Sequence, residues 1–228
     1  MAREQWTRLL ASAPTDAVLI SNDRDEMMPL WYLQFVENTR RDVVGLFPRI
    51  TPAPEYSNVA RLTASVIDTG RPVFFIKNMP GLEIKFRTQA SGALWQVVET
   101  NRAPEKVIDA ILGKRVRILG FDAMRDADAL RAVIFWQPLV KLDANYTTFA
   151  HLLDSNGKKI AQGNDHQVGG EFYPTSLWDA GETLRDEFVI SLPPNIVQGD
   201  YRLLVGMYRS SDGEMLGEPV VVGGVEIK

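Results

Sequence analysis

Polar side chains cluster directly after the apolar run 17–21, where Asn22, Asp23, Asp25 and Glu26 precede a segment with helical periodicity. Ligands of open α/β sheets bind beyond the carboxyl ends of the strands, so these acidic residues are the first candidates for a cation or sugar-hydroxyl site. The same residues suit a helix start. Asn22 or Asp23 can accept the free N–H groups, and Asp25 and Glu26 complement the positive end of the helix dipole. Capping alone is the favoured interpretation.

A second candidate site is the polar loop Gly163–Gln167, which contains Asp165 and His166. A carboxylate beside an imidazole could ligate a metal ion, but an ordinary surface loop is the default interpretation. The other histidine, His151, lies in an alternating strand-like segment on the same face as Phe149, which favours a packed, hydrogen-bonded side chain. We therefore predict no metal site.

Aromatic rings flank a short connection in the second half of the chain, where Tyr173 and Trp178 lie on either side of Pro174–Ser176. Such rings can stack on the C–H face of a sugar, so both residues are weak candidates for ligand binding. The alternative, which we favour, is an aromatic lid that closes the end of a β-sandwich.

Several classes of protein are excluded by what the sequence lacks. The phosphate-binding patterns GxGxxG and GxxxxGK and the nucleophile pattern GxSxG are absent from the expected positions, so we expect no cofactor and no serine hydrolase chemistry. The absence of cysteine excludes disulfides and thiolate ligands. Nucleic acid is not an expected partner, because the net charge is −4 and no long basic cluster occurs.

The periodicity of the apolar residues changes along the chain. Up to about residue 111, apolar runs alternate with helical patterns, which predicts an α/β domain with a parallel sheet and helices on both faces. Residues 103–112 are read as a last helix or a connector. From residue 112 onward, short alternating runs separated by turn sequences predict an all-β antiparallel sandwich. We therefore expect two domains, 1–111 and 112–228.

Two stretches of the chain resemble a known family. The segment Ser21–Val43 resembles the soluble region after the membrane helices of bacterial protein O-mannosyltransferase-like membrane proteins, which are glycosyltransferases of the GT-C type. The segments Phe135–Phe188 and Gly199–Tyr208 resemble a β-sandwich at the C-terminus of such enzymes. The first match rests on the following residues: Asp23, Asp25, Pro29, Leu30, Trp31, Tyr32, Leu33, Gln34, Arg41, Asp42 and Val43.

This resemblance implies a non-catalytic accessory region of a polyprenyl-phosphate-sugar-dependent membrane glycosyltransferase. Its partners would be the membrane-embedded core of that enzyme or membrane-adjacent glycans, and it would dock or position a glycan or acceptor. No catalytic residue is carried over, because the family's catalytic acid lies between membrane helices and no stretch here has the roughly 20 apolar residues of a span.

The expected location is extracytoplasmic, either periplasmic or on the cell surface, with attachment through a missing N-terminal part. A cytoplasmic location is the alternative if Met1 is the true start. Two other functions stay open at this point. One is a stand-alone enzyme that acts on a sugar or phosphosugar at Asp23, Asp25 and Glu26, and the other is a purely structural interaction module.

Overall fold

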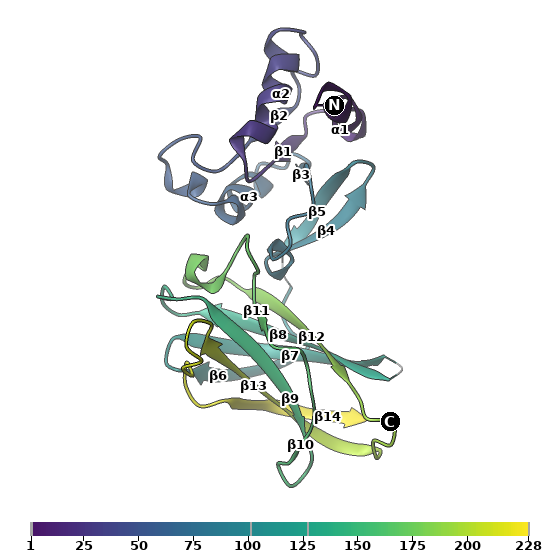
Figure 1. The fold of residues 1–228 in the computed structure, drawn as a ribbon, viewed down its shortest axis with the longest axis vertical. Helices are drawn as coiled ribbons and strands as arrows, with labels where there is room; N and C mark the ends of the chain where they lie inside the picture. Colours follow the sequence, from purple (N-terminus) through teal and green to yellow (C-terminus); the bar gives the residue numbers. More distant parts are fainter. Residues whose placement is uncertain (1, 101, 127, 228) are drawn as a thin grey trace. The chain divides into compact units, whose positions relative to one another are not determined.

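The structure is a computed structural model that describes residues 2–100, 102–126 and 128–227. Its contacts divide the chain into two compact units, residues 1–100 and 101–228. Each unit is described by itself. All three described α-helices belong to the first unit, which is coloured purple to blue in Figure 1.

The first unit contains a five-stranded sheet in the order β2-β1-β3-β5-β4. Strands β2 and β3 both run parallel to β1, whereas β5 runs antiparallel to β3 and forms a hairpin with β4. The elements are α1 (Ala2–Ser12), β1 (Val18–Ile20), α2 (Arg24–Phe35), β2 (Val44–Leu46), η1 (Pro54–Tyr56), α3 (Val59–Ile67), β3 (Val73–Phe75), η2 (Leu82–Ile84), β4 (Phe86–Ser91) and β5 (Leu94–Thr100).

The predicted fold class, an α/β domain with a parallel sheet and helices on both faces ahead of a sandwich, is wrong. Over the described residues the chain is β-rich, with 41% strand, 18% helix, three helices and three sheets. Each parallel strand has only three residues, and the longer strands β4 and β5 pair antiparallel. Strand-like and helix-like periodicity identifies the elements, but it does not specify the direction in which two distant strands pair.

The core beside α1 and α2 follows from the spacing of their apolar residues. Helix α2 buries Met27, Leu30 and Leu33, which lie three residues apart and therefore on one face. They pack in one cluster with Leu19 of β1 and Phe74 of β3. This packing holds the start of α2 at the carboxyl end of β1, which places the polar residues 21–26.

Arg40 joins the end of α1 to the loop before β2. Its guanidinium donates to the backbone oxygens of Leu10 (2.6 Å), Ala13 (3.0 Å) and Pro14 (2.9 Å). The same group contacts both carboxylate oxygens of Asp42, at 2.9 and 2.8 Å. This pairing lowers the pKa of Asp42. One side chain therefore satisfies the carbonyls that the C-terminus of α1 leaves without partners.

Replacement of Arg40 by alanine is expected to lower the free energy of unfolding of the first unit by about 2 kcal/mol, because charge-assisted hydrogen bonds to three carbonyls are lost. Arg40→Lys should recover little, since an ammonium cannot reproduce the planar fork. Urea unfolding of the full chain, with hydrogen exchange at α1 as the local readout, measures the loss. Unchanged exchange at α1 in Arg40→Ala would contradict this role.

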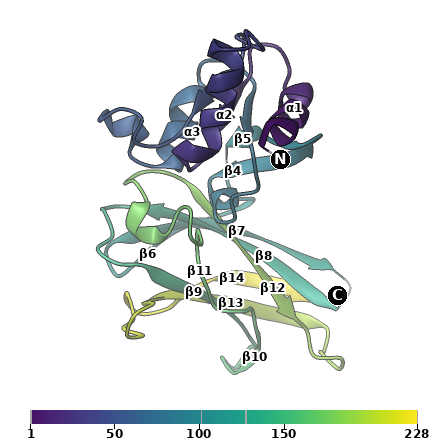
Figure 2. The same cartoon turned by 45° about the horizontal axis from the view of Figure 1, so that its top comes forward.

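The second unit consists of two antiparallel sheets. One has the order β10-β9-β13-β14, with β11 paired to β9, and the other has the order β12-β8-β7-β6. Figure 2 shows β13 and β14 in one layer and β7 and β8 in the other. The elements are β6 (Lys106–Leu112), β7 (Val116–Asp126), β8 (Ala129–Pro138), β9 (Tyr146–Leu153), β10 (Lys159–Gln162), β11 (His166–Gln167), η3 (Thr175–Leu177), β12 (Leu184–Ser191), β13 (Gly199–Arg209) and β14 (Val220–Ile227).

The segment read as a last helix or connector is the strand β6, which pairs antiparallel with β7. Gly113 and Lys114 connect the two strands, and both have positive φ values, +56° and +58°. Two positive φ values in succession characterise the type I′ turn, whose twist matches that of a β-hairpin. The backbone conformation at 113–114 therefore allows β6, whose side-chain pattern is ambiguous, to form a hairpin with β7.

Candidate functional site

The acidic residues Asp23 and Asp25 act at the start of α2. Asp23 is the N-cap, with an extended backbone, and its Oδ1 accepts a hydrogen bond of 2.8 Å from the N–H of Asp25. The Asp25 carboxylate is exposed and pairs with the guanidinium of Arg24 at 2.9 Å. Both side chains thus complete the first turn of the helix, as the capping interpretation requires.

Glu26 belongs to a different cluster, at the carboxyl ends of β1 and β3. Its Oε1 accepts from Lys77 Nζ at 2.7 Å, and its Oε2 accepts from the hydroxyl of Ser21. The Ser21 hydroxyl oxygen in turn accepts from the N–H of Asp23 at 3.0 Å. The structure therefore brings Glu26 together with two residues, Ser21 and Lys77, that the sequence analysis had not linked to it.

The position of this cluster is the one at which open sheets usually bind ligands. Strand β1 lies between β2 and β3. The connection after β1 leads to its neighbour on one side, β2, and the next connection leads to its neighbour on the other side, β3. Here the Glu26 carboxylate is already compensated by an ammonium and a hydroxyl. Among the residues described, no group of three His, Asp or Glu side chains could hold a metal ion. The cluster serves to connect α2 with the end of β3.

His166 lies in the short strand β11 and pairs with a buried carboxylate. Its Nε2 lies 2.7 Å from Oδ1 of Asp186, whose side chain is only 1% exposed. The other oxygen of Asp186 accepts from Trp136 Nε1 at 3.2 Å. His166 lies in β11, which pairs with β9, whereas Asp186 lies in β12 of the other sheet. The ion pair therefore joins the two sheets of the second unit.

The electrostatics of this pair follow from the hydrogen bond between the two side chains. The hydrogen bond to Asp186 raises the pKa of His166 to about 9, against the opposing effect of burial. His166 Nδ1 lies 3.0 Å from the backbone oxygen of Asn164, which suits an imidazolium that donates from both nitrogens. The neighbouring Asp165 points elsewhere and accepts from the hydroxyl of Tyr208 at 3.2 Å. Asp165 and His166 do not share a site.

Tyr173 and Trp178 are completely buried. The indole N–H of Trp178 donates to the backbone oxygen of Tyr173 at 3.1 Å, and the Tyr173 hydroxyl donates to Glu182 Oε1 at 2.7 Å. Glu182 Oε1 also accepts from the N–H of Asp179 at 2.7 Å. In this arrangement neither ring presents an exposed face on which a sugar could stack.

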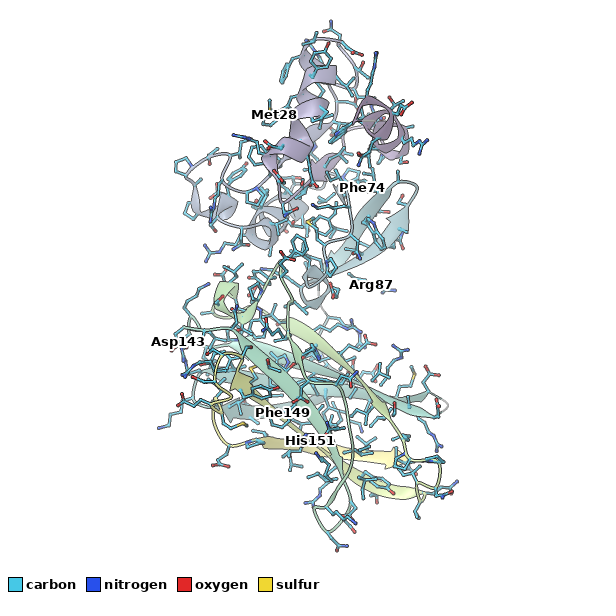
Figure 3. The ribbon with its side chains drawn as sticks, viewed as in Figure 1. Met28, Phe74, Arg87, Asp143, Phe149 and His151 are labelled. Carbon is cyan, nitrogen blue, oxygen red and sulfur yellow. The ribbon has the colours of Figure 1, made fainter. Side chains whose placement is uncertain are left out.

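The outer face of α2 is a surface that the sequence analysis missed. Figure 3 labels one of its residues, Met28, on the side of the helix away from Phe74. The exposed apolar residues of α2 and its C-cap are Met28 (50%), Tyr32 (56%), Phe35 (71%) and Val36 (62%). Their spacing of four, three and one residues places them on one side of the helix.

This outer face, defined by Met28, Tyr32, Phe35 and Val36, could have been found from the sequence. Helix α2 is apolar on both sides, because a second stripe of large apolar residues accompanies the one that packs on the sheet. A helix that is apolar all round is normally buried all round. Within the described residues, no helix is long and apolar enough to span a membrane. The second stripe therefore needs a different explanation.

A hollow of about 440 Å³ lies between α1 and the C-terminal end of α2. Leu10, Ala11 and Leu33 provide its apolar lining. Arg3 and Glu37, which also line the hollow, form an ion pair of 2.9 Å. None of the four residues of the outer face lines this hollow, so it is a separate feature of the first unit.

No protein-family model and no curated protein matches the chain. Among solved structures, it is similar to a beta-glucuronidase from glycoside hydrolase family 2 (TM-score 0.32, 11% identity, 45% of this chain and 11% of that one). It is also similar to a glycosyl hydrolase family 2 member from Bacteroides cellulosilyticus DSM 14838 (TM-score 0.32, 10% identity, 66% and 19%). A third structure is a putative beta-galactosidase from Bacteroides fragilis (TM-score 0.31, 13% identity, 60% and 20%). The chain corresponds to a fifth or less of each of these proteins.

Proposed function

We propose that this chain is a non-catalytic docking region that binds an apolar surface of a partner protein through the outer face of α2. The observation that carries the proposal is the row of four large exposed apolar side chains, Met28, Tyr32, Phe35 and Val36, on a single helix. Exposed apolar residues are ordinary when scattered, whereas a contiguous group marks an interaction surface. A helix with anchors at this spacing fits a partner groove or a second helix.

The energetics favour a partner over permanent exposure. Full burial of one large apolar side chain stabilises by about 1.5–3 kcal/mol, so a partner that covers all four gains enough to offset much of the cost of association. Polar groups border the stripe at both ends, with Arg24 and Asp25 at one end and Glu37 at the other. An apolar centre with a polar rim is the usual anatomy of a protein interface.

The partner that we propose is the membrane-embedded core of a polyprenyl-phosphate-sugar-dependent glycosyltransferase. The support for this choice is the segment Ser21–Val43, which contains the whole of α2 and carries the resemblance to the soluble part of such enzymes. The acidic residues Asp23, Asp25 and Glu26 each have a structural role at the start of the same helix. We therefore propose docking rather than catalysis for this region, in an extracytoplasmic location beside the membrane.

A photo-crosslinking amino acid at position 35 is expected to couple this chain to a multi-spanning glycosyltransferase in membranes of the source organism. Position 197 is the matched control, because Val197 is exposed to a similar degree (73%, against 71% for Phe35) but lies in a loop of the second unit. Mass spectrometry of the crosslinked product identifies the partner. Crosslinks to lipid alone, or equal yields from both positions, would refute the proposed partner.

The double substitution Tyr32→Asp/Phe35→Asp is expected to weaken association with the partner by at least about a hundredfold. Each substitution replaces an apolar anchor that the proposed partner covers with a charge. The folded unit should tolerate the change, because both side chains point away from the core. Val197→Asp is the matched control for an added charge. Co-purification and glycosyltransferase activity are the readouts. Unchanged association in the double variant would rule out the outer face as the docking surface.

A further inference from the structure

A second hollow lies in the second unit, against the outer side of strands β6 and β7. Its volume is about 440 Å³, within the range of small-molecule sites. Most of its lining is apolar and includes Pro104, Val107 and Leu119. Val107 is 76% exposed, an unusual degree for a valine within a strand. Arg102, Arg117 and Thr183 add a few polar groups, which matches the composition of a binding pocket.

Arg117 contributes a buried donor that lacks a hydrogen bond. The Nε atom of Arg117 is buried and has no hydrogen-bond partner among the described residues. The Oδ1 of Asp109 lies 3.1 Å from this atom, which is close enough for an ion pair but without hydrogen-bond alignment. The Asp109 side chain itself is largely exposed. A buried N–H without an aligned acceptor costs free energy, so the poor alignment of this ion pair needs a reason.

The other guanidinium of the hollow is already occupied. Arg102 donates to Asp122 Oδ2 at 2.7 Å and to the backbone oxygen of Ala103 at 3.1 Å. Asp122 Oδ1 also accepts from the N–H of Glu105 at 2.6 Å. These contacts fix the wall of the hollow and neutralise Arg102. Arg117, whose ion pair with Asp109 lacks hydrogen-bond alignment, is the guanidinium of the hollow better placed to recognise a ligand.

We propose that this hollow binds a small organic carboxylate with an apolar body. The ligand's carboxylate takes the place of the Asp109 carboxylate and accepts from the Nε edge of Arg117. A guanidinium binds a carboxylate through two parallel hydrogen bonds, which a free ligand can align better than Asp109 does from its own strand. The apolar body covers Pro104, Val107 and Leu119. The site lies in the second unit and does not depend on the docking role of α2.

The probes that test the proposal are 1-naphthoate and its uncharged counterpart 1-naphthamide, titrated into the full chain by NMR or calorimetry. Naphthoate is expected to bind about tenfold more tightly than naphthamide, because only the carboxylate forms a charged pair with Arg117. Amide shifts on naphthoate binding should be confined to β6 and β7. Equal affinities of the two probes, or no binding of either, would overturn the proposal.

Two substitutions distinguish recognition of the ligand's carboxylate by Arg117 from nonspecific apolar binding in the hollow. Arg117→Gln should abolish the preference for naphthoate, and Asp109→Asn should raise naphthoate affinity several-fold by removing the competing internal carboxylate. Arg131→Gln is the matched control, because Arg131 pairs with Glu187 away from the hollow. If Arg117→Gln does not fold, the affinities of naphthoate and naphthamide for the unmodified chain and for Asp109→Asn still test the proposal. A naphthoate affinity that Asp109→Asn leaves unchanged or lowers would contradict the exchange of carboxylates.

Discussion

Replacement of His166 by alanine is expected to lower the free energy of unfolding of the second unit by about 3 kcal/mol, because it leaves a buried carboxylate without its counter-charge. Asp186 is almost completely buried and keeps only the hydrogen bond from Trp136 when His166 is removed. The loss belongs at the lower end of the range for broken buried pairs, since the His166 side chain is 38% exposed and water can enter. Urea unfolding of the full chain, with hydrogen exchange at β8 and β12, is the measurement.

The double variant His166→Ala/Asp186→Asn tests whether the orphaned charge is the cause. It should be more stable than the sum of the two single losses predicts, because the asparagine needs no counter-charge. Additive losses would mean that the two side chains act separately. His151→Ala is the matched control, since the His151 ring packs on Phe149 at a centroid distance of 4.9 Å and takes no part in the ion pair of Asp186. Figure 3 labels both residues of this ring pair on β9.

The same pair gives the second unit a defined dependence on pH. The pKa of His166 in the folded chain is raised from 6.5 to about 9, so folding favours the protonated form. Its contribution to stability is complete below pH 6.5 and is lost as the pH rises toward 9. His166→Ala should remove this decline. The pKa of His151 is lowered, first by burial and then by the charge of Lys159, so its effect has the opposite sign and appears below pH 6.5.

The substitution Gly113→Ala is expected to destabilise the second unit by about 3 kcal/mol or more, through a steric clash in addition to backbone strain. A Cβ atom at this position would lie 1.8 Å from the backbone oxygen of Leu216. Backbone atoms cannot move aside as a flexible side chain does, so the turn between β6 and β7 or the segment around Leu216 must shift. Thermal unfolding and hydrogen exchange at β6 measure the effect.

Gly213→Ala separates the clash from the strain. Gly213 also has a positive φ, +77°, but a Cβ there would meet no atom within 4 Å. Its replacement should therefore cost only about 1 kcal/mol, the strain of a left-handed backbone at a residue other than glycine. Similar losses in the two variants would show that close packing at Gly113 contributes nothing beyond its φ angle.

Much of the candidate site at α2 could be predicted from local sequence. Asp23 caps the helix because its carboxylate needs only the N–H two residues ahead, and such an interaction is encoded within one turn. The partners of Glu26 could not be predicted in this way. Lys77 is 51 residues away in the chain, and only the parallel pairing of β1 with β3 brings its ammonium to the carboxylate.

The position of Tyr32 shows a different limit. Its neighbours Leu30 and Leu33 pack in the core, and their spacing alone does not show on which side of the helix Tyr32 lies. The register of α2 on the sheet decides otherwise, because Met27, Leu30 and Leu33 occupy the inner side and turn Tyr32 outward. An apolar residue in a helix that is apolar all round can be assigned to a side only when the packing partner is known.

The sequence by itself determined local features of this protein, such as the apolar runs that became strands and the capping of α2 by Asn22 or Asp23. These depend on residues a few positions apart, whose geometry the backbone imposes. Only the tertiary structure decided that β5 pairs antiparallel with β3, that His166 neutralises Asp186 across two sheets, and that Arg117 Nε meets Asp109 beside a hollow without hydrogen-bond alignment. Each of these depends on the direction and register in which distant strands meet, and burial then sets the cost of an unpaired charge or donor.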